Sequence, residues 1–307
     1  MIRDFATTNS PALRATALAW LSGEHDEPVP VRPAATVMIV RDARGGDGAV
    51  AGGGDGAEAG GAGDGDGASP VEVFLLRRVA SMAFAPSTMV FPGGGVDSRD
   101  RAQLPWAGPG VIEWSARLGA DEDATRMLVV AAVREVFEEC GVLFASVGEA
   151  GPLVDVSTPE WDAVRAGLVA RELSLNDVLR THGLCLRTDL LRAHAHWVTP
   201  VFEPRRFDTR FFVALMPEGR AIDGLTSEAD HSGWFDPAAV LADYAAGQAI
   251  VLPPTLVCLE DLARAQSAAE FFAQEPVIRR IMPELVVDDA GEAVMRVDFA
   301  GTRAPRE

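Results

Sequence analysis

Three glutamates at helical spacing are the residues of this chain best suited to chemistry. The run at residues 134–142 reads REVFEECGV and places Glu135, Glu138 and Glu139 at positions i, i+3 and i+4. On a helix these carboxylates point to one side and repel one another unless a positive charge lies among them. Because Mg²⁺ and Mn²⁺ prefer carboxylate oxygens, a divalent metal ion is a natural partner for this cluster.

A solvated helix face is the alternative interpretation, in which Arg134 simply pairs with Glu138 across one helical turn. Two neighbouring features favour a site instead. Gly141 follows the last glutamate and is expected to end the helix, as glycine does at helix C-termini. Upstream, the run FPGGG at residues 91–95 predicts a tight glycine turn, which lets backbone approach a ligand closely.

At these residues the sequence resembles the Nudix hydrolase family, whose box reads Gly-x5-Glu-x7-Arg-Glu-U-x-Glu-Glu-x-Gly-U, with U apolar. The second half of the box is intact at residues 134–142. In the first half, Gly94 matches the opening glycine, and Asp100 stands where the first glutamate belongs. About two dozen more residues than the family spacing allows then separate Asp100 from Arg134. The split leaves the role of Asp100 open.

An interrupted box resembles the Nudix subgroup that includes the peroxisomal coenzyme A diphosphatase type. Segments 75–97, 196–214 and 227–241 also look like that subgroup, and the likeness covers about residues 33–262. The resemblance implies an α/β protein of the Nudix type, an α/β/α sandwich around a mixed central sheet. It implies Mg²⁺- or Mn²⁺-dependent cleavage of a diphosphate linkage, preferably in coenzyme A or acyl-CoA, to 3′,5′-ADP and (acyl-)phosphopantetheine.

The resemblance also assigns roles to residues of the box. Glu135, Glu138 and Glu139 would hold the metal ions, and one of them would act as general base; which one stays open. Arg134 would orient the glutamates by ion pairing, in support of the metal ligands. The backbone carbonyl near Gly94 would complete a metal shell, and we expect Gly93 and Gly94 to contact substrate.

Candidates outside the box are weaker. Arg77 and Arg78 end a predicted strand, where they are either solvated or in contact with substrate phosphate, because a guanidinium fits phosphate oxygens. Arg206 is a second candidate for phosphate recognition, in a basic cluster with Arg205 and Arg210. The alternative is that Arg206 or Arg210 pairs with Asp208. Glu228 matches an acidic position that some Nudix enzymes use as base or metal ligand, by analogy.

Composition limits the class of protein. A net charge of −18 argues against nucleic acid and anionic membranes as partners, and no segment is apolar enough to span a bilayer. Three scattered cysteines without CxxC spacing predict reduced thiols. Without a secretory pattern at the start, a cytoplasmic protein is expected. The expected partner is a small-molecule diphosphate, and a homodimer is left open.

Composition also suggests how the chain is organised. We expect a helix and connector at residues 1–32, the Nudix domain at 33–265 and a C-terminal extension at 266–307. Residues 43–69 are almost all Gly, Ala and Asp. They cannot bury enough apolar area to become ordered, so we expect a flexible loop there. Residues 101–125 interrupt the box, and whether they shape the pocket or pack on its rim is left open.

The alternation of predicted strands and helices indicates a mixed sheet covered by helices. Strands are predicted at 35–40, 71–76, 88–91, 197–201, 210–215 and 294–299. Helices are predicted at 11–21, 121–139, 161–168, 175–182, 237–246 and 254–265.

Two other functions fit the same residues. One is hydrolysis of NADH, ADP-ribose or another nucleotide derivative by the same site. The other is a catalytically silent Nudix-fold ligand sensor. The complete set of glutamates argues against the sensor, because a sensor need not keep three repelling carboxylates on one helix.

Overall fold

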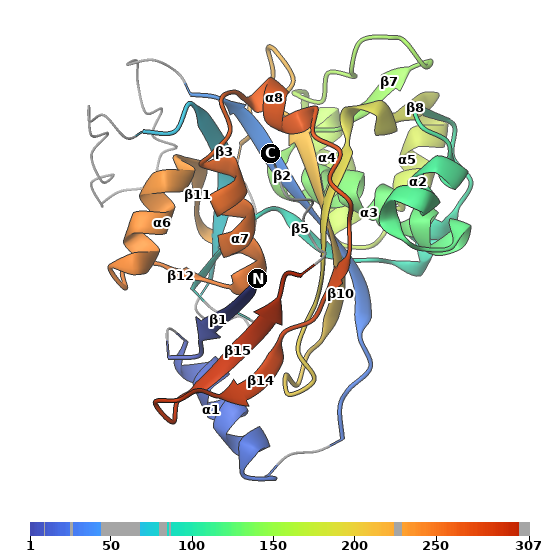
Figure 1. Ribbon diagram of the computed structural model, residues 1–307. Helices are drawn as coiled ribbons and strands as arrows, with labels where there is room; N and C mark the ends of the chain where they lie inside the picture. The colour runs from blue at the N-terminus through green and yellow to red at the C-terminus, as the bar shows by residue number, and fades with distance from the viewer. Residues whose placement is uncertain are drawn as a thin grey trace.

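A mixed sheet with helices on both faces forms the centre of the protein in the computed structural model (Figure 1). The structure describes residues 1–8, 10–24, 27–43, 68–79, 85, 87–223 and 229–300. The predicted flexible loop therefore lies almost wholly outside the described residues, and so does Glu228. The described part confirms the expected α/β fold with its mixed sheet.

The sheet has the strand order β12-β4-β3-β2-β10-β9-β13, with β11 paired to β3 and β5 paired to β2. At its centre β10 runs parallel to β2, while β9 runs antiparallel to β10. The bounds are β2 (Arg32–Asp42), β3 (Val71–Arg78), β4 (Thr88–Val90), β5 (Gly93–Gly95), β9 (Arg192–Val198), β10 (Phe207–Leu215), β11 (Ala229–Phe235), β12 (Ile250–Val251) and β13 (Arg280–Ile281).

Both faces of this sheet are buried, which explains why its strands are apolar almost throughout. On β2, Val37 and Ile39 pack into a first core, and Met38 and Val40 pack into a second core on the opposite face. The first core is covered by α2 (Val111–Leu118), α3 (Glu122–Cys140), α4 (Pro159–Val169) and α5 (Leu175–Thr181). The second is covered by α6 (Pro237–Ala245), α7 (Pro253–Leu262) and α8 (Ala268–Phe272).

The two ends of the chain meet in a smaller sheet. Strand β1 (Ile2–Ala6) pairs with β15 (Ala293–Asp298), which also pairs with β14 (Glu284–Val287), and this sheet contributes Phe5 and Met295 to the second core. Helix α1 (Pro11–Leu21) follows β1 and is capped by Ser10, as predicted. The sequence analysis expected no strand at residues 2–6, because the partner that makes it a strand lies at the other end of the chain.

The segment that interrupts the box is part of the first core. Its strand β6 (Trp106–Ala107) joins β8 (Leu184–Arg187), which also pairs with β7 (Ala145–Val147). On α2, Trp114 is fully buried, and its ring centroid lies 5.8 Å from that of Phe212 on β10. The Arg210 side chain donates from Nε to the Leu118 carbonyl at the end of α2, at 3.0 Å. The insertion is thus fastened to the sheet by packing and by a hydrogen bond.

One further observation concerns membranes. Of the helices in the described ranges, none combines the length and the apolar character that crossing a bilayer requires.

We predict that Trp114→Ala lowers the free energy of unfolding by about 3–5 kcal/mol, because it leaves a cavity in the first core. Urea denaturation measures this change. The matched control is Ile112→Ala on the same helix, where the side chain is 75% exposed and the change should stay within about 0.5 kcal/mol. Equal effects of the two substitutions would contradict a core role for the insertion.

Candidate active site

Helix α3 carries the three glutamates and has a defined start and end. Asp121 caps its N-terminus by accepting a hydrogen bond from the Ala124 N–H at 2.8 Å. Gly141 ends it with φ +67, and its N–H donates to the Phe137 carbonyl. The left-handed conformation at this position favours glycine. The buried apolar residues of the helix include Leu128, Val129, Ala132, Val133 and Val136.

The glycine turn forms strand β5 and lies directly against the carboxylates of α3. The Gly93 N–H donates to Glu139 Oε2 at 2.8 Å. A Cβ atom on Gly94 would lie 2.7 Å from the carboxylate of Glu135, so a side chain there would displace it. The expected close approach of backbone therefore exists, and in the structure it is made to the helix that carries the glutamates.

Arg134 is the centre of the site's hydrogen-bond network. Its Nη1 donates to Glu135 Oε1 at 2.7 Å and to Glu138 Oε1 at 3.3 Å. Its Nη2 donates to the Gly95 carbonyl at 2.9 Å. The side chain is largely buried, so one guanidinium ties two of the glutamates to the glycine strand.

Asp100 completes this network from the other half of the split box. Its two carboxylate oxygens accept from Nε and Nη2 of Arg134, each at 3.0 Å, although the residues are 34 apart in sequence. It lies in the short helix η1 (Ser98–Arg101), is only 2% exposed, and also accepts from the Asp97 N–H at 2.8 Å. The role that the sequence left open is therefore to anchor Arg134.

The electrostatics of the site favour a cation. Burial raises the pKa of Glu135 to about 7, and burial also raises the pKa of Glu138, while Arg134 opposes both shifts. Asp100, Glu135 and Glu138 contact the single guanidinium of Arg134, and Glu139 adds a further carboxylate that accepts from the Gly93 N–H. This excess of partly desolvated negative charge, carried by hard oxygen donors, suits Mg²⁺ or Mn²⁺.

The carboxylates point to protein partners in this conformation. Among the described residues, no group of three or more His, Cys, Asp or Glu side chains is arranged to hold a metal ion. Glu135 and Glu138 turn toward Arg134, and Glu139 turns toward Gly93. Metal binding would thus need rotation of glutamate side chains on a helix whose backbone is already in place.

Sequence reasoning missed Arg165, which contacts the C-terminal end of α3, the helix that carries the glutamates. From α4, its Nε donates to the Glu138 carbonyl at 2.8 Å, and its Nη1 forms an ion pair with Asp223 Oδ2 at 2.5 Å. A cation at the C-terminal carbonyls of a helix is favourable, because those groups carry partial negative charge. Arg165 lies 27 residues beyond Glu138 in an ordinary helix, and no motif in the sequence marks it.

Three arginines were candidates from the sequence outside the box. Arg77 is half exposed and pairs with Asp230 at 2.7 Å, and Arg78 ends β3. Arg206 is separated from Gly94 by two strand spacings and four residues along the strand, a Cα distance of roughly 16 Å. The structure therefore brings together Gly93, Gly94, Arg134, Glu135, Glu138 and Glu139, and it places Arg206 away from them.

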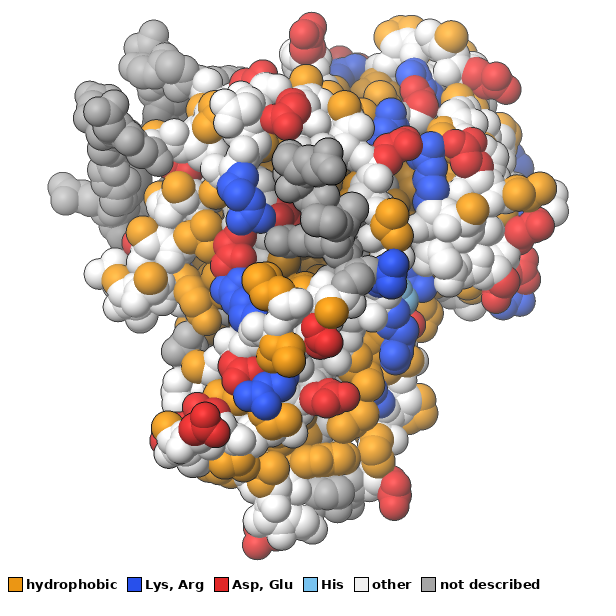
Figure 2. All heavy atoms as spheres, viewed as in Figure 1, with side chains coloured by type: hydrophobic (Ala, Val, Ile, Leu, Met, Phe, Trp, Pro, Cys, Tyr) orange, Lys and Arg blue, Asp and Glu red, His pale blue; other side chains and the backbone are white. Residues whose placement is uncertain are grey.

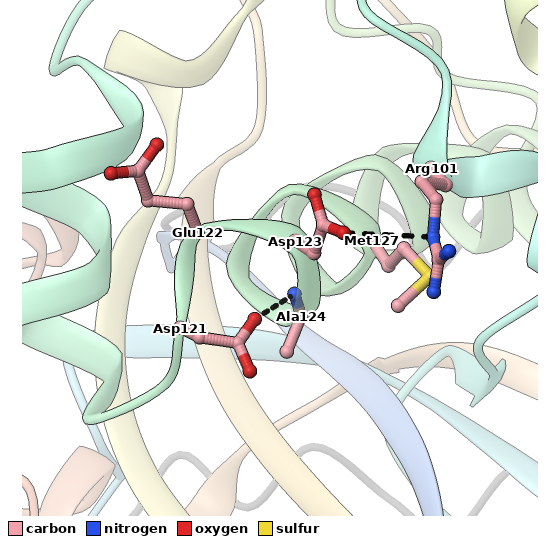
Figure 3. Close-up of a pocket in the computed structure, with 6 residues that line it drawn as sticks. All are labelled: Arg101, Asp121, Glu122, Asp123, Ala124 and Met127. Atoms are coloured by element: carbon pink, nitrogen blue, oxygen red, sulfur yellow. Dashed lines mark hydrogen bonds and ion pairs between the residues drawn. The ribbon is translucent and has the colours of Figure 1, made fainter.

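A surface recess at the opposite end of α3 is distinct from this site (Figure 3). Arg101 lines it together with Asp121, Asp123 and Met127, and Arg101 approaches Asp123 at 4.0 Å. Asp123 precedes Glu135 by three helical turns, a rise of roughly 18 Å. Acidic residues dominate the lining, which is unsuited to a phosphate ligand.

Comparison with known proteins identifies the fold and its box. No family model matches the chain. The crystal structure of a NUDIX hydrolase from Alicyclobacillus acidocaldarius is 27% identical and superimposes with a TM-score of 0.61, over 81% of this chain and 98% of that one. Putative nudix hydrolase 7 of Caenorhabditis elegans is 32% identical over 192 residues, 62% of this chain and 56% of that protein. The chain belongs to the Nudix hydrolase superfamily.

A second curated relative is named as an acyl-coenzyme A diphosphatase. Acyl-coenzyme A diphosphatase NUDT19 of Xenopus laevis is 27% identical over 223 residues, which is 61% of this chain and 58% of that protein. The chain thus spans a little over half the length of the curated relatives it matches. In this Nudix protein the two halves of the box meet in space, through Asp100 and Arg134, despite the insertion between them.

We predict that Gly94→Ala disrupts the site, because the added Cβ meets the Glu135 carboxylate at 2.7 Å. Metal affinity measured by calorimetry should fall about tenfold or more, the equivalent of one lost charge-assisted contact. Gly95→Ala is the matched control, since a Cβ there meets nothing within 4 Å. If both variants bind Mg²⁺ like the wild type, the close approach of Gly94 to Glu135 has no functional role.

Proposed function

We propose that this Nudix protein is a metal-dependent hydrolase that cleaves the diphosphate linkage of coenzyme A or acyl-CoA. The observation that carries the proposal is the buried cluster of Asp100, Glu135 and Glu138 on Arg134, with Glu139 on the adjacent glycine strand. The interrupted box and the likeness to an acyl-coenzyme A diphosphatase support this substrate class.

The chain's own residues have separate tasks in this proposal. Glu135, Glu138 and Glu139 would hold Mg²⁺ or Mn²⁺, with the carbonyl of Gly94 beside them. The bound metal supplies an activated water and neutralises the charge that develops on the phosphate. Arg134 keeps the glutamates oriented, and Asp100 fixes Arg134 by accepting two hydrogen bonds. The Gly93 N–H holds Glu139 in place.

The reaction is hydrolysis, in which water adds to one phosphorus and the bridging P–O bond breaks. For coenzyme A the products are 3′,5′-ADP and phosphopantetheine, and an acyl group stays on the latter. In this proposal the glutamates and Arg134 act only at the metal ions and the diphosphate. These residues therefore do not discriminate between acyl chains.

A mass-spectrometric substrate screen tests the proposal. Purified protein is incubated with coenzyme A, acetyl-CoA, a long-chain acyl-CoA, NADH and ADP-ribose, with Mg²⁺, with Mn²⁺ and with chelator. Metal-dependent release of 3′,5′-ADP supports the proposed substrate. Turnover of NADH or ADP-ribose alone would keep Nudix hydrolysis and overturn the coenzyme A assignment. Binding without any turnover would favour a ligand sensor.

We predict that Glu139→Gln lowers kcat by roughly 10²–10⁴-fold, the range for loss of an acid–base or ligating carboxylate. The fold should persist, because a glutamine oxygen still accepts from the Gly93 N–H. Steady-state kinetics on the best substrate and circular dichroism measure the two effects. Glu203→Gln, in the β9–β10 turn, is the control and should leave kcat unchanged. Full activity in a folded Glu139→Gln protein would refute the assigned role.

We predict that metal affinity rises with pH between about 5.5 and 7.5. Burial raises the pKa of Glu135 to about 7 in the metal-free protein, so a proton competes with the cation below that value. Because the pKa of Glu135 is higher in the folded protein than in the unfolded chain, protonated Glu135 stabilises the metal-free fold at low pH, and this stabilisation is lost as pH rises through 7. A bound metal ion stabilises the ionised carboxylate and so offsets the lost stability.

Calorimetric titration with Mn²⁺ across this pH range measures the effect. Glu135→Gln should flatten the pH dependence. Glu203→Gln should not, although burial also raises the pKa of Glu203 to about 7, because Glu203 is remote from α3. A pH-independent affinity in the wild type would contradict the role of Glu135 as a ligand.

A further inference from the structure

A group of arginines lies on the sheet face that α2 and α3 cover, away from the glutamates. We call Arg206, Arg210 and Arg280 the arginine cluster. Arg210 pairs with His196 across β10 and β9, and His196 pairs with Arg280 across β9 and β13. Residues paired in this way share a face. Figure 2 shows basic side chains gathered beside a histidine over the region where β10 runs in Figure 1.

Alternation along the chain places the remaining member on the same face. Arg206 precedes Arg210 by four residues, with Asp208 between them. Ile281 packs against the second core, so its neighbour Arg280 faces the first. The arginine cluster therefore lies on one side of the sheet.

The acidic residue within this cluster is already engaged. Asp208 Oδ1 lies 2.6 Å from His196 Nε2 and also accepts from Nη1 of Arg210. Arg210 in turn donates from Nε to the Leu118 carbonyl and is buried. The sequence left open whether Arg206 or Arg210 pairs with Asp208, and in the structure Asp208 pairs with Arg210 and also contacts His196.

Arg206 and Arg280 have no acidic partner among the described residues. Arg206 donates to the carbonyls of Thr199 and Val29, at 3.1 and 2.9 Å, and to the sulfur of Met282 at 3.5 Å. These bonds hold its guanidinium in position while leaving further N–H groups unused. The chain has 45 acidic residues and 27 basic ones, all arginine, so an arginine pair without a carboxylate is unusual here.

The two guanidinium groups lie close to each other. Nη2 of Arg206 lies 3.5 Å and Nη2 of Arg280 lies 3.9 Å from the same sulfur atom of Met282, so the two nitrogens are at most about 7.4 Å apart. Two like charges this close favour an anion that accepts hydrogen bonds from both. Burial and the charge of Arg280 lower the pKa of Arg206, as expected for positive charge that lacks a counter-ion.

We propose that Arg206 and Arg280 form a phosphate-binding site separate from the glutamates. Guanidinium groups bind phosphate oxygens through paired, charge-assisted hydrogen bonds. The ligand class is a phosphate dianion, either free or as a monoester on a nucleotide. The proposal does not rest on hydrolase activity, because the site lies roughly 16 Å from Gly94 and needs no metal ion.

Calorimetric titration in chelator and low salt tests the site with two probes, inorganic phosphate and 3′,5′-ADP. We expect the wild type to bind phosphate, Arg280→Ala to raise Kd about tenfold, and the double variant with Arg206→Ala to lose binding. Arg280 makes no hydrogen bond to main chain among the described contacts, so its variant should fold normally. Tighter binding of 3′,5′-ADP than of phosphate, lost in the same variants, identifies a nucleotide monoester as the ligand.

Two controls separate this site from the glutamates. Arg14→Ala removes an exposed arginine that pairs with Glu292 and should leave phosphate affinity unchanged. Glu139→Gln should also leave it unchanged, even where that variant abolishes turnover. The proposal is overturned if the wild type does not bind phosphate without metal, if Glu139→Gln removes binding, or if the double variant of Arg206 and Arg280 retains it.

Discussion

The ion-pair network of Arg134 is the interaction on which the site depends. A buried guanidinium is stable only when its donors meet oxygen acceptors, because a desolvated charge without partners costs several kcal/mol. Asp100 supplies two acceptors, Glu135 and Glu138 supply one each, and the Gly95 carbonyl supplies another. The same contacts that satisfy Arg134 also hold the glutamates near the glycine strand. Removing a single acceptor would leave part of this charge uncompensated and loosen both sides of the site.

The insertion between the box halves is compatible with this network because the segment is folded. The entropic cost of closing a loop grows only with the logarithm of the loop length, and burial of apolar side chains offsets that cost. Trp114 and Leu118 pack into the first core, and β6 pairs with β8. Both ends of the insertion are therefore held, by η1 at one end and by α3 at the other. Asp100 therefore meets Arg134 despite the insertion between them.

Charge is distributed unevenly over one face of the sheet. The carboxylates gather where α3 crosses β2 and β5, and the arginine cluster lies across β10, β9 and β13. Between them, Ala35 on β2 is paired to Gly94 on one side and to Arg210 on the other. The two groups thus occupy neighbouring parts of a common scaffold, one rich in carboxylates and one rich in guanidinium groups.

Periodicity and local motifs determined a large part of this protein in advance. The helix that carries the glutamates, its end at Gly141 and the close glycine turn were predictable, because each depends on residues within a few positions of one another. The contact of Asp100 with Arg134 was left open by the sequence, Arg165 was missed, and so was strand β1. Asp100 and Arg134 are 34 positions apart, and Arg165 is 27 positions from Glu138. The Asp4–Arg296 ion pair, which joins β1 to β15, spans 292 positions. No local pattern encodes such a pairing; the packing of helices on the two faces of the sheet decides which distant side chains become neighbours.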